Sequence, residues 1–353
     1  MNFEAAYDQL NAEQKSAVDQ IEGPVMVLAG PGTGKTQMIA LRIAQILRKT
    51  QAAPHNILCL TFTESGAVAM RKRLLSFIGE TAYGVRIHTF HSFCNEVIQD
   101  YPTEFLFARE LSALTEVERI QFFRELLDQL GENTPLRPFG SPYFYLKDIT
   151  KAIQDLKREN ASPERLQAVV QEGEALIASY AETITAFVST HANQLAAADF
   201  ERIKTELTGT PFAAYLDGDT DDKKNRTVMK SALKDAFEEW QREIPKQLAL
   251  CGIYKNYQDM LRSRGRYDFE DMISFVTEKL KQNPELRARY QEQFQYILVD
   301  EYQDTNSAQN EVVRLLGEFF ENPNIFVVGD DKQSIYRFQC ASLENLLYFY
   351  QLY

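Results

Sequence analysis

The sequence lacks paired cysteines, long apolar runs and a signal peptide. Its four cysteines are isolated, with no C-x-x-C pair and no histidine at ligand spacing, so neither a disulfide framework nor a zinc site is indicated. The thiols are expected to be reduced and mostly buried. The longest apolar stretches, such as residues 25–29 and 297–299, fall far short of the ~20 residues that span a bilayer. These absences predict a globular, cytoplasmic protein with no membrane contact.

An excess of positive charge is also missing. The formal net charge of the 353 residues is −12, which argues against a protein that is basic all over and coats nucleic acid. A local track of DNA contacts is compatible with this charge, because base stacking can supply much of the affinity. With 44% apolar residues, the chain can bury a large core and is long enough for two or three structural units.

Short apolar runs alternate with helical patterns near both ends of the chain. The runs cover residues 25–29, 57–62, 296–300 and 324–330, and helical patterns follow the first three of them. This βα rhythm is typical of an α/β fold, in which helices cover a parallel sheet. Both blocks are too small to be separate domains, so the pattern predicts one sheet that is interrupted by an excursion of the chain.

The excursion is predicted to be helical. From about residue 101 to residue 265, apolar residues recur at helical spacing among Glu, Leu, Lys, Gln and Ala. We therefore expect residues 1–105 and 261–353 to form the α/β domain and residues 106–260 to form an all-helical insertion. Residues 217–227 are polar and charged, which predicts a surface loop. The insertion could grip duplex DNA or brace the sheet, and the basic cluster in this loop favours a solvated surface over a DNA contact.

A glycine-rich turn follows the first apolar run directly. It reads A-G-P-G-T-G-K-T over residues 29–36 and precedes a helical pattern, as in P-loop nucleotide-binding proteins. Such a loop points backbone N–H groups and a helix N-terminus at phosphates, while the lysine reaches the β and γ phosphates and the hydroxyl binds Mg²⁺. Ala29 departs mildly from the strict pattern, and the spacing does not fit the dinucleotide motif G-x-G-x-x-G. The residues expected to bind ATP and Mg²⁺ here are Gly30, Pro31, Gly32, Thr33, Gly34, Lys35 and Thr36.

An acidic pair ends the third apolar run. A carboxylate at the carboxyl end of a parallel strand lies beside the phosphate loop, so Asp300 is expected to hold Mg²⁺. The adjacent Glu301 is expected to orient and deprotonate the water that attacks the γ-phosphate. Acidic pairs are common on surfaces, and it is the buried strand before this pair that makes it a candidate catalytic site.

Seven short motifs, in order along the chain, resemble those of UvrD/Rep/PcrA-type helicases of superfamily 1A. The motifs are Leu10-Asn11 with Gln14 and residues 61–63, 88–92, 267–271, 300–304, 329–338 and 341–345. The resemblance implies the first RecA-like domain of such a helicase, interrupted by a helical insertion. The insertion matches the family in position and character alone.

The resemblance implies roles for residues outside the phosphate site. It implies that Gln14 recognises adenine and that Gln333 senses the γ-phosphate, which places Gln333 with Lys35, Asp300 and Glu301 as a catalytic residue. The residues that it implies for DNA contact are Phe62, Thr63, Thr89, His91, Tyr336 and Phe338. Gln37 stands where the family commonly has an arginine that stacks on adenine, so base binding is expected to be looser. Glu64-Ser65 replaces the usual Asn-Lys, which removes a cation from the DNA path.

By resemblance, the function is that of an ATP-dependent DNA translocase that runs 3′ to 5′ on single strands and unwinds duplex. Its expected partners are single-stranded and partially duplex DNA, together with nuclease or repair proteins. In this family a second RecA-like domain supplies the transition-state arginines, so the chain alone is expected to bind nucleotide but to hydrolyse it slowly. The alternative is a nucleotide-gated DNA-binding scaffold in a helicase–nuclease complex. An intact set of catalytic residues favours the motor.

Overall fold

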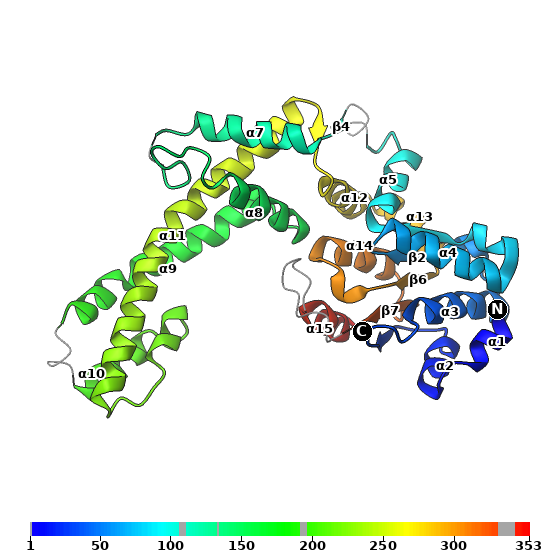
Figure 1. Cartoon of the computed structure of the whole chain (residues 1–353), viewed down its shortest axis with the longest axis horizontal. Coiled ribbons are helices and arrows are strands. Elements are labelled where there is room, and N and C mark those ends of the chain that lie inside the picture. The colour runs from blue at the N-terminus through cyan, green and yellow to red at the C-terminus, as the bar shows by residue number, and fades with distance from the viewer. Residues whose placement is uncertain (1, 106–110, 133, 191–195, 331–342) are drawn as a thin grey trace. The chain divides into compact units, whose positions relative to one another are not determined.

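The computed structural model describes residues 2–105, 111–132, 134–190, 196–330 and 343–353 (Figure 1). Contacts within the chain divide it into two compact units. Unit 1 comprises residues 1–115, 151–160 and 261–353, and unit 2 comprises residues 116–150 and 161–260. Each unit has a hydrophobic core of its own.

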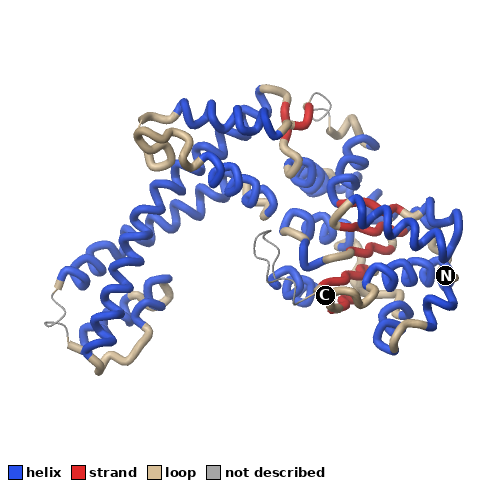
Figure 2. The backbone as a smooth tube through the Cα atoms, viewed as in Figure 1, coloured by secondary structure: helices blue, strands red, loops and turns tan. Residues whose placement is uncertain are grey.

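Unit 1 is built on a five-stranded parallel sheet with the strand order β1-β7-β6-β2-β3 (Figure 2). Its strands are β1 Val25–Leu28, β2 Ile57–Thr61, β3 Arg86–Thr89, β6 Tyr296–Val299 and β7 Ile325–Gly329. The three central strands are buried along their whole length, as expected for a parallel sheet that is covered on both faces. The chain therefore forms the α/β fold with a parallel sheet that its sequence predicts. Because all five strands run the same way, their carboxyl ends meet at one edge.

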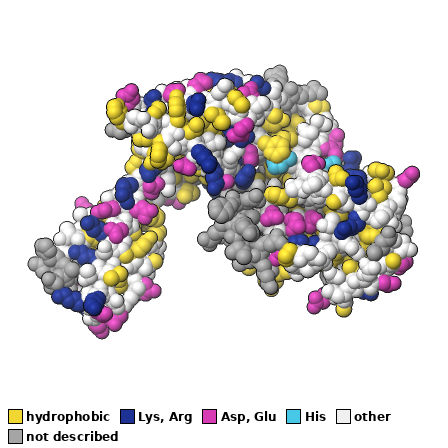
Figure 3. All heavy atoms as spheres, viewed as in Figure 1, with side chains coloured by type: hydrophobic (Ala, Val, Ile, Leu, Met, Phe, Trp, Pro, Cys, Tyr) yellow, Lys and Arg dark blue, Asp and Glu magenta, His cyan; other side chains and the backbone are white. Residues whose placement is uncertain are grey.

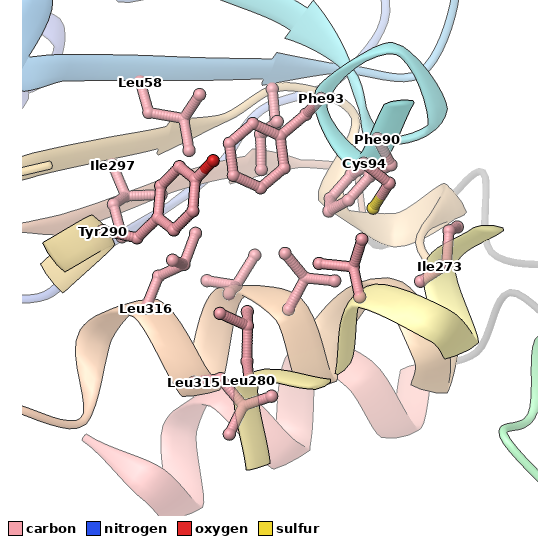
Figure 4. Packing of buried hydrophobic residues seen from close by; sticks show 14 of the residues in the cluster. Leu58, Phe90, Phe93, Cys94, Ile273, Leu280, Tyr290, Ile297, Leu315 and Leu316 are labelled. Atoms are coloured by element: carbon pink, nitrogen blue, oxygen red, sulfur yellow. The ribbon is translucent and has the colours of Figure 1, made fainter. Parts of the chain in front are cut away.

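Alternate residues of each central strand pack against different helices. On one face, Cys59, Leu298 and Phe326 join a core formed with the helices α1 Phe3–Asp8, α2 Ala12–Asp19, α3 Lys35–Lys49 and α4 Glu64–Ile78. On the other face, Leu58, Ile297 and Val327 pack against α5 Phe90–Asp100, α12 Asp271–Gln282, α13 Pro284–Gln293 and α14 Ser307–Gly317. Figure 4 shows Phe93 and Tyr290 between the sheet and these helices. The result is a three-layer arrangement that leaves the sheet edge for the site.

Unit 2 consists mainly of helices. They are α7 Glu116–Gln129, the first part of α8 Leu146–Arg158, α9 Pro163–Ser189, α10 Ala197–Glu206 and most of α11 Lys223–Ser263. Apolar residues from the last three helices, including Ile184, Phe200 and Leu233, form its core. The last turns of α8 belong to unit 1. Unit 1 also contains a two-stranded parallel sheet of β4 Ser112–Ala113 and β5 Arg266–Tyr267, which the sequence did not reveal, and the helix α15 Leu343–Leu352.

The predicted loop over residues 217–227 is wrong in its second half, because α11 begins at Lys223. The Asp222 carboxylate accepts a hydrogen bond from the backbone N–H of Lys224, and the Asp222 carbonyl accepts one from Arg226. Aspartate is a favoured helix N-cap, and the apolar positions that follow, such as Met229 and Leu233, are buried in the core of unit 2. Capping and burial together therefore override the local polarity of residues 223–227.

Two further expectations concern the surface and the thiols. No helix among the described residues is both long and apolar enough to cross a membrane. Cys59, Cys94 and Cys251 are buried free thiols, as expected, whereas Cys340 lies outside the described residues. Figure 3 shows acidic and basic side chains intermixed over the face in view, in keeping with a chain that is not basic throughout.

Candidate nucleotide and DNA site

The glycine-rich turn lies between β1 and α3. Gly32 and Gly34 have φ angles of 74° and 84°, which favour glycine, and Gly34 caps α3 without a side-chain hydrogen bond to the helix N-terminus. Apart from the adjacent residues of the chain, a Cβ atom placed on Gly30, Gly32 or Gly34 would meet no atom of the described residues within 4 Å. The loop therefore presents backbone N–H groups and an uncapped helix N-terminus, a combination that suits phosphate oxygens.

The first turn of α3 contacts the acidic pair that follows β6. The Lys35 Nζ lies 2.9 Å from Glu301 Oε2, and Lys35 is only 8% exposed. The Thr36 side chain lies close enough to the Asp300 carboxylate to favour its ionised form, and the Asp300 backbone N–H donates to the carbonyl of Leu60 on β2. The sheet thus brings together four side chains that come from distant parts of the sequence.

These residues fit a Mg²⁺–nucleotide complex. Burial, and next the negative charge of Glu301, raise the pKa of Asp300 to about 6, so a bound cation would favour its ionised form. Among the described residues, no three His, Cys, Asp or Glu side chains form a set that could hold a metal ion. A single carboxylate and one hydroxyl suit Mg²⁺ that also binds phosphate oxygens and water, because Mg²⁺ is seldom caged by protein ligands alone.

Gln303 joins Glu301 to other parts of the site. It lies in the 3₁₀ turn Tyr302–Asp304 and is fully buried. Its Nε2 donates to Glu301 Oε2 at 2.8 Å and to Asp304 Oδ2 at 3.2 Å, while its Oε1 accepts from the backbone N–H of Asp330 at 3.0 Å. Burial, followed by the charge of Glu301, raises the pKa of Asp304. The sequence does not reveal this role of Gln303, because burial of the side chain and its bond to Asp330, 27 residues away, arise only in the folded chain.

Gln14 lies beside the phosphate loop. Its Nε2 donates to the Thr33 carbonyl at 3.0 Å, and its Oε1 accepts from the Asn11 backbone N–H in a capping box of α2. The buried Arg42 of α3 holds this helix in place, because its guanidinium donates to the Ala17 carbonyl at 2.5 Å. Gln37 is half-buried in the first turn of α3. Both glutamines are therefore near the phosphate loop, on the elements that flank it.

A cavity of about 260 Å³ has Asp304 in its lining. Phe62, His91 and Phe269 line it, together with the ionisable residues Lys157, Arg158, Glu270 and Asp304 and with Ile273, Asn306, Ala308 and Gln309. Phe62 is 42% exposed. The His91 ring stacks on Phe269 with a centroid distance of 3.9 Å, and its buried Nε2 finds no hydrogen-bond partner among the described residues. An exposed aromatic ring beside an unpartnered imidazole nitrogen suits a nucleobase, which stacks and forms hydrogen bonds at its edges.

Thr63 and Thr89 each follow or precede a lining residue of this cavity within two positions in the sequence, and each side chain caps a helix. Thr63 caps α4 by accepting the backbone N–H of Gly66, and Thr89 caps α5 by accepting that of Ser92. The Thr89 hydroxyl also donates to Glu64 Oε1 at 2.9 Å. Three further residues of the predicted site, Gln333, Tyr336 and Phe338, lie outside the described residues.

The imidazole of His91 should make stability depend on pH. Burial, and next the positive charge of Arg158, lower its pKa from 6.5 to about 4. Between these two values the unfolded chain binds more protons at His91 than the folded chain does, so stability rises with pH. The contribution is complete above pH ~6.5 and is lost as the pH falls towards about 4, by on the order of 2–3 kcal/mol.

The variant His91→Phe keeps a ring on Phe269 and removes the titrating group. Urea unfolding between about pH 7.5 and 4.5 should show the wild type losing stability relative to this variant as the pH falls. If the free energies of unfolding of the two proteins changed in parallel with pH, His91 would not be buried as a neutral imidazole.

The fold and the site together define a class of protein. A phosphate loop between a parallel strand and a helix, with an acidic pair at the end of another strand of the same sheet, is the arrangement of a P-loop nucleotide-binding protein. Residues 10–353 match the family described as the UvrD/REP helicase N-terminal domain, and the chain belongs to this family.

Curated relatives match over almost the whole chain. DNA helicase II of Rickettsia typhi is 30% identical over 340 residues, which cover 96% of this chain and 40% of the relative. The ATP-dependent DNA helicase PcrA of Staphylococcus epidermidis is 29% identical over 349 residues, 99% of this chain and 37% of the relative. The PcrA protein of Staphylococcus aureus is 28% identical over 345 residues, 98% of this chain and 36% of the relative. The chain thus spans about two fifths of the length of these relatives.

Proposed function

We propose that this chain is the nucleotide-binding first part of an ATP-dependent DNA helicase that moves 3′ to 5′ on single-stranded DNA. The main support for the proposal is one observation: a single acidic turn, residues 300–304, contributes to both the nucleotide site and the cavity. Glu301 pairs with Lys35 of the phosphate loop, and Asp304, three residues further on, lines the cavity that contains Phe62 and His91. The names of the relatives, DNA helicase II and ATP-dependent DNA helicase PcrA, support the assignment of ATP and DNA as ligands.

Each residue of the nucleotide site has a role in this proposal. Lys35 binds the β and γ phosphates, and the backbone N–H groups of the loop share that charge. Thr36 and Asp300 hold Mg²⁺, which neutralises charge on the phosphates. Glu301 orients the attacking water and accepts its proton, and Gln14 lies at the adenine end of the site.

We further expect residues 1–353 alone to hydrolyse ATP slowly. Among the described contacts, Lys35 is the cation that pairs with the acidic pair. Arginines that stabilise the transferring phosphoryl group are worth about 10³-fold or more in rate. In the proposed helicase such arginines would come from outside residues 1–353. Measurement of fast, DNA-stimulated ATP hydrolysis by this chain would contradict the expectation.

The DNA part of the proposal predicts a specific effect of Phe62→Ala. The half-exposed ring supplies a stacking surface at the cavity, and stacking is worth about 1–3 kcal/mol per base, so the affinity for a labelled oligo(dT) should fall about 5- to 100-fold. Fluorescence anisotropy at fixed salt measures this change directly.

The matched control is Phe319→Ala. Phe319 is 60% exposed and packs against Phe320 beyond the end of α14, away from the residues that line the cavity. Its removal should leave the affinity for oligo(dT) within about twofold of the wild type, because it deletes an exposed ring without touching the site. Equal losses in the two variants would show that the affinity does not depend on the cavity.

A further inference from the structure

Gln303 is the buried residue that connects the nucleotide site to the cavity. Its side chain is fully buried and makes three hydrogen bonds to other described residues. Two of its partners are carboxylates, Glu301 and Asp304, and the third is the backbone N–H of Asp330 at the carboxyl end of β7. One amide therefore contacts both carboxylates of its own turn and the backbone at the end of β7.

The Glu301 carboxylate is shared between Gln303 and the phosphate loop. Its Oε2 atom lies 2.9 Å from Lys35 Nζ and 2.8 Å from Gln303 Nε2. Glu301 has a φ angle of 50°, which is unusual for a residue other than glycine, so its position depends on the contacts that hold it. The contacts from Lys35 and Gln303 therefore together fix the position of Glu301.

An amide is the side chain that these partners require. It offers two N–H donors for two carboxylates and one oxygen for a backbone N–H. A carboxylate in its place would supply no donor and would add a third negative charge beside Glu301 and Asp304. An apolar side chain would leave buried polar groups unsatisfied.

We propose that Gln303 is a positioning residue that couples nucleotide binding at Lys35 to DNA affinity at the cavity. A change in the Lys35–Glu301 contact alters the hydrogen bond between Glu301 and the Gln303 amide. The altered position of the amide then changes the positions of its other two partners, Asp304, which lines the cavity, and Asp330. The inference rests on the proposed function, because it needs both ligands to bind. The coupling is reciprocal, so nucleotide changes DNA affinity and DNA changes nucleotide affinity by the same factor.

The test measures the ratio of oligo(dT) affinities with and without a non-hydrolysable ATP analogue and Mg²⁺. In the wild-type chain this ratio should differ from one by at least about fivefold, the lower end of typical allosteric couplings. In Gln303→Met, which keeps the length of the side chain and removes its hydrogen bonds, the ratio should fall to within about twofold of one. The affinities for each ligand alone should change much less, because Gln303 is fully buried and is not among the residues that line the cavity.

Gln291→Met is the matched control. Gln291 is also a buried glutamine of unit 1, but it donates to the Leu315 carbonyl, away from the site. The Gln291→Met variant should lose stability as Gln303→Met does, but it should keep the wild-type ratio of oligo(dT) affinities. Gln303→Asn, a second variant that keeps the amide but is one methylene too short to reach all three partners, should also lose the coupling, so the inference remains testable if the methionine variant does not fold.

The outcomes separate the inference from the proposed function. If the wild type binds both ligands but its ratio lies within about twofold of one, or if both Gln303 variants keep the wild-type ratio, the inference is overturned and the proposed function stands. If the wild type binds neither nucleotide nor oligo(dT), the proposed function itself fails. If Gln291→Met lost as much coupling as Gln303→Met, the role of Gln303 would be structural only.

Discussion

Replacing Lys35 with alanine should lower the affinity of the chain for Mg²⁺-ATP by about 30- to 100-fold, because the variant loses charge-assisted hydrogen bonds that are worth about 2–3 kcal/mol. Lys35 is buried at the first turn of α3, where the loop glycines and the helix N-terminus converge. No other cation is paired with Glu301 among the described residues, so a neighbour is not in place to substitute for it. Titration with a fluorescent ATP analogue measures the change.

Two further variants identify the cause of the loss. Lys49→Ala removes an exposed lysine from the end of the same helix, where it pairs with Asp19, and should leave nucleotide affinity unchanged. Glu301→Gln breaks the Lys35–Glu301 ion pair but keeps the lysine, so it should bind nucleotide at least as tightly as the wild type. Equal affinity of the wild type and Lys35→Ala would refute the phosphate site.

The sequence predicts four of the five strands of the sheet but not the edge strand β3. The strands β2, β6 and β7 are continuous apolar runs, and such runs are typical of strands buried on both faces. By contrast, β3 reads R-I-H-T and alternates between half-buried and buried positions, so its four residues give too weak a pattern. The strand order pairs Val25 with Phe326, a contact that no local pattern contains.

The nucleotide site is easier to predict than the cavity for a physical reason. Phosphate binding depends on a local loop, so the spacing of Gly34, Lys35 and Thr36 within one turn already indicates it. The cavity depends on tertiary neighbours. Phe269 would pass for an ordinary core residue in the sequence, and only the folded chain brings it to the ring of His91. The roles of Gln303 and Lys157 likewise depend on partners that are distant in the sequence, Asp330 and Asp268 respectively.

Lys157 supports the cavity through a buried group of charges. Its Nζ lies 2.9 Å from Asp268 Oδ2 and 2.8 Å from Asp271 Oδ1, and all three side chains are less than a tenth exposed. The two carboxylates flank Phe269 in the sequence, and Phe269 stacks on His91. The last turn of α8 therefore holds the segment that forms one wall of the cavity.

Replacing Lys157 with alanine should lower the free energy of unfolding by about 3–5 kcal/mol, because it leaves two buried carboxylates without their shared cation. Urea unfolding followed by circular dichroism measures the loss. The matched control is Lys281→Ala, on α12, which removes a half-exposed lysine paired with Glu311 and should cost less than about 1 kcal/mol. The triple variant Lys157→Met, Asp268→Asn, Asp271→Asn removes the whole charge group, so it should recover a large part of the loss. If the triple variant were no more stable than Lys157→Ala, lost packing rather than unpaired charge would explain the effect, and the segment that carries Phe269 would not depend on these charges for its position.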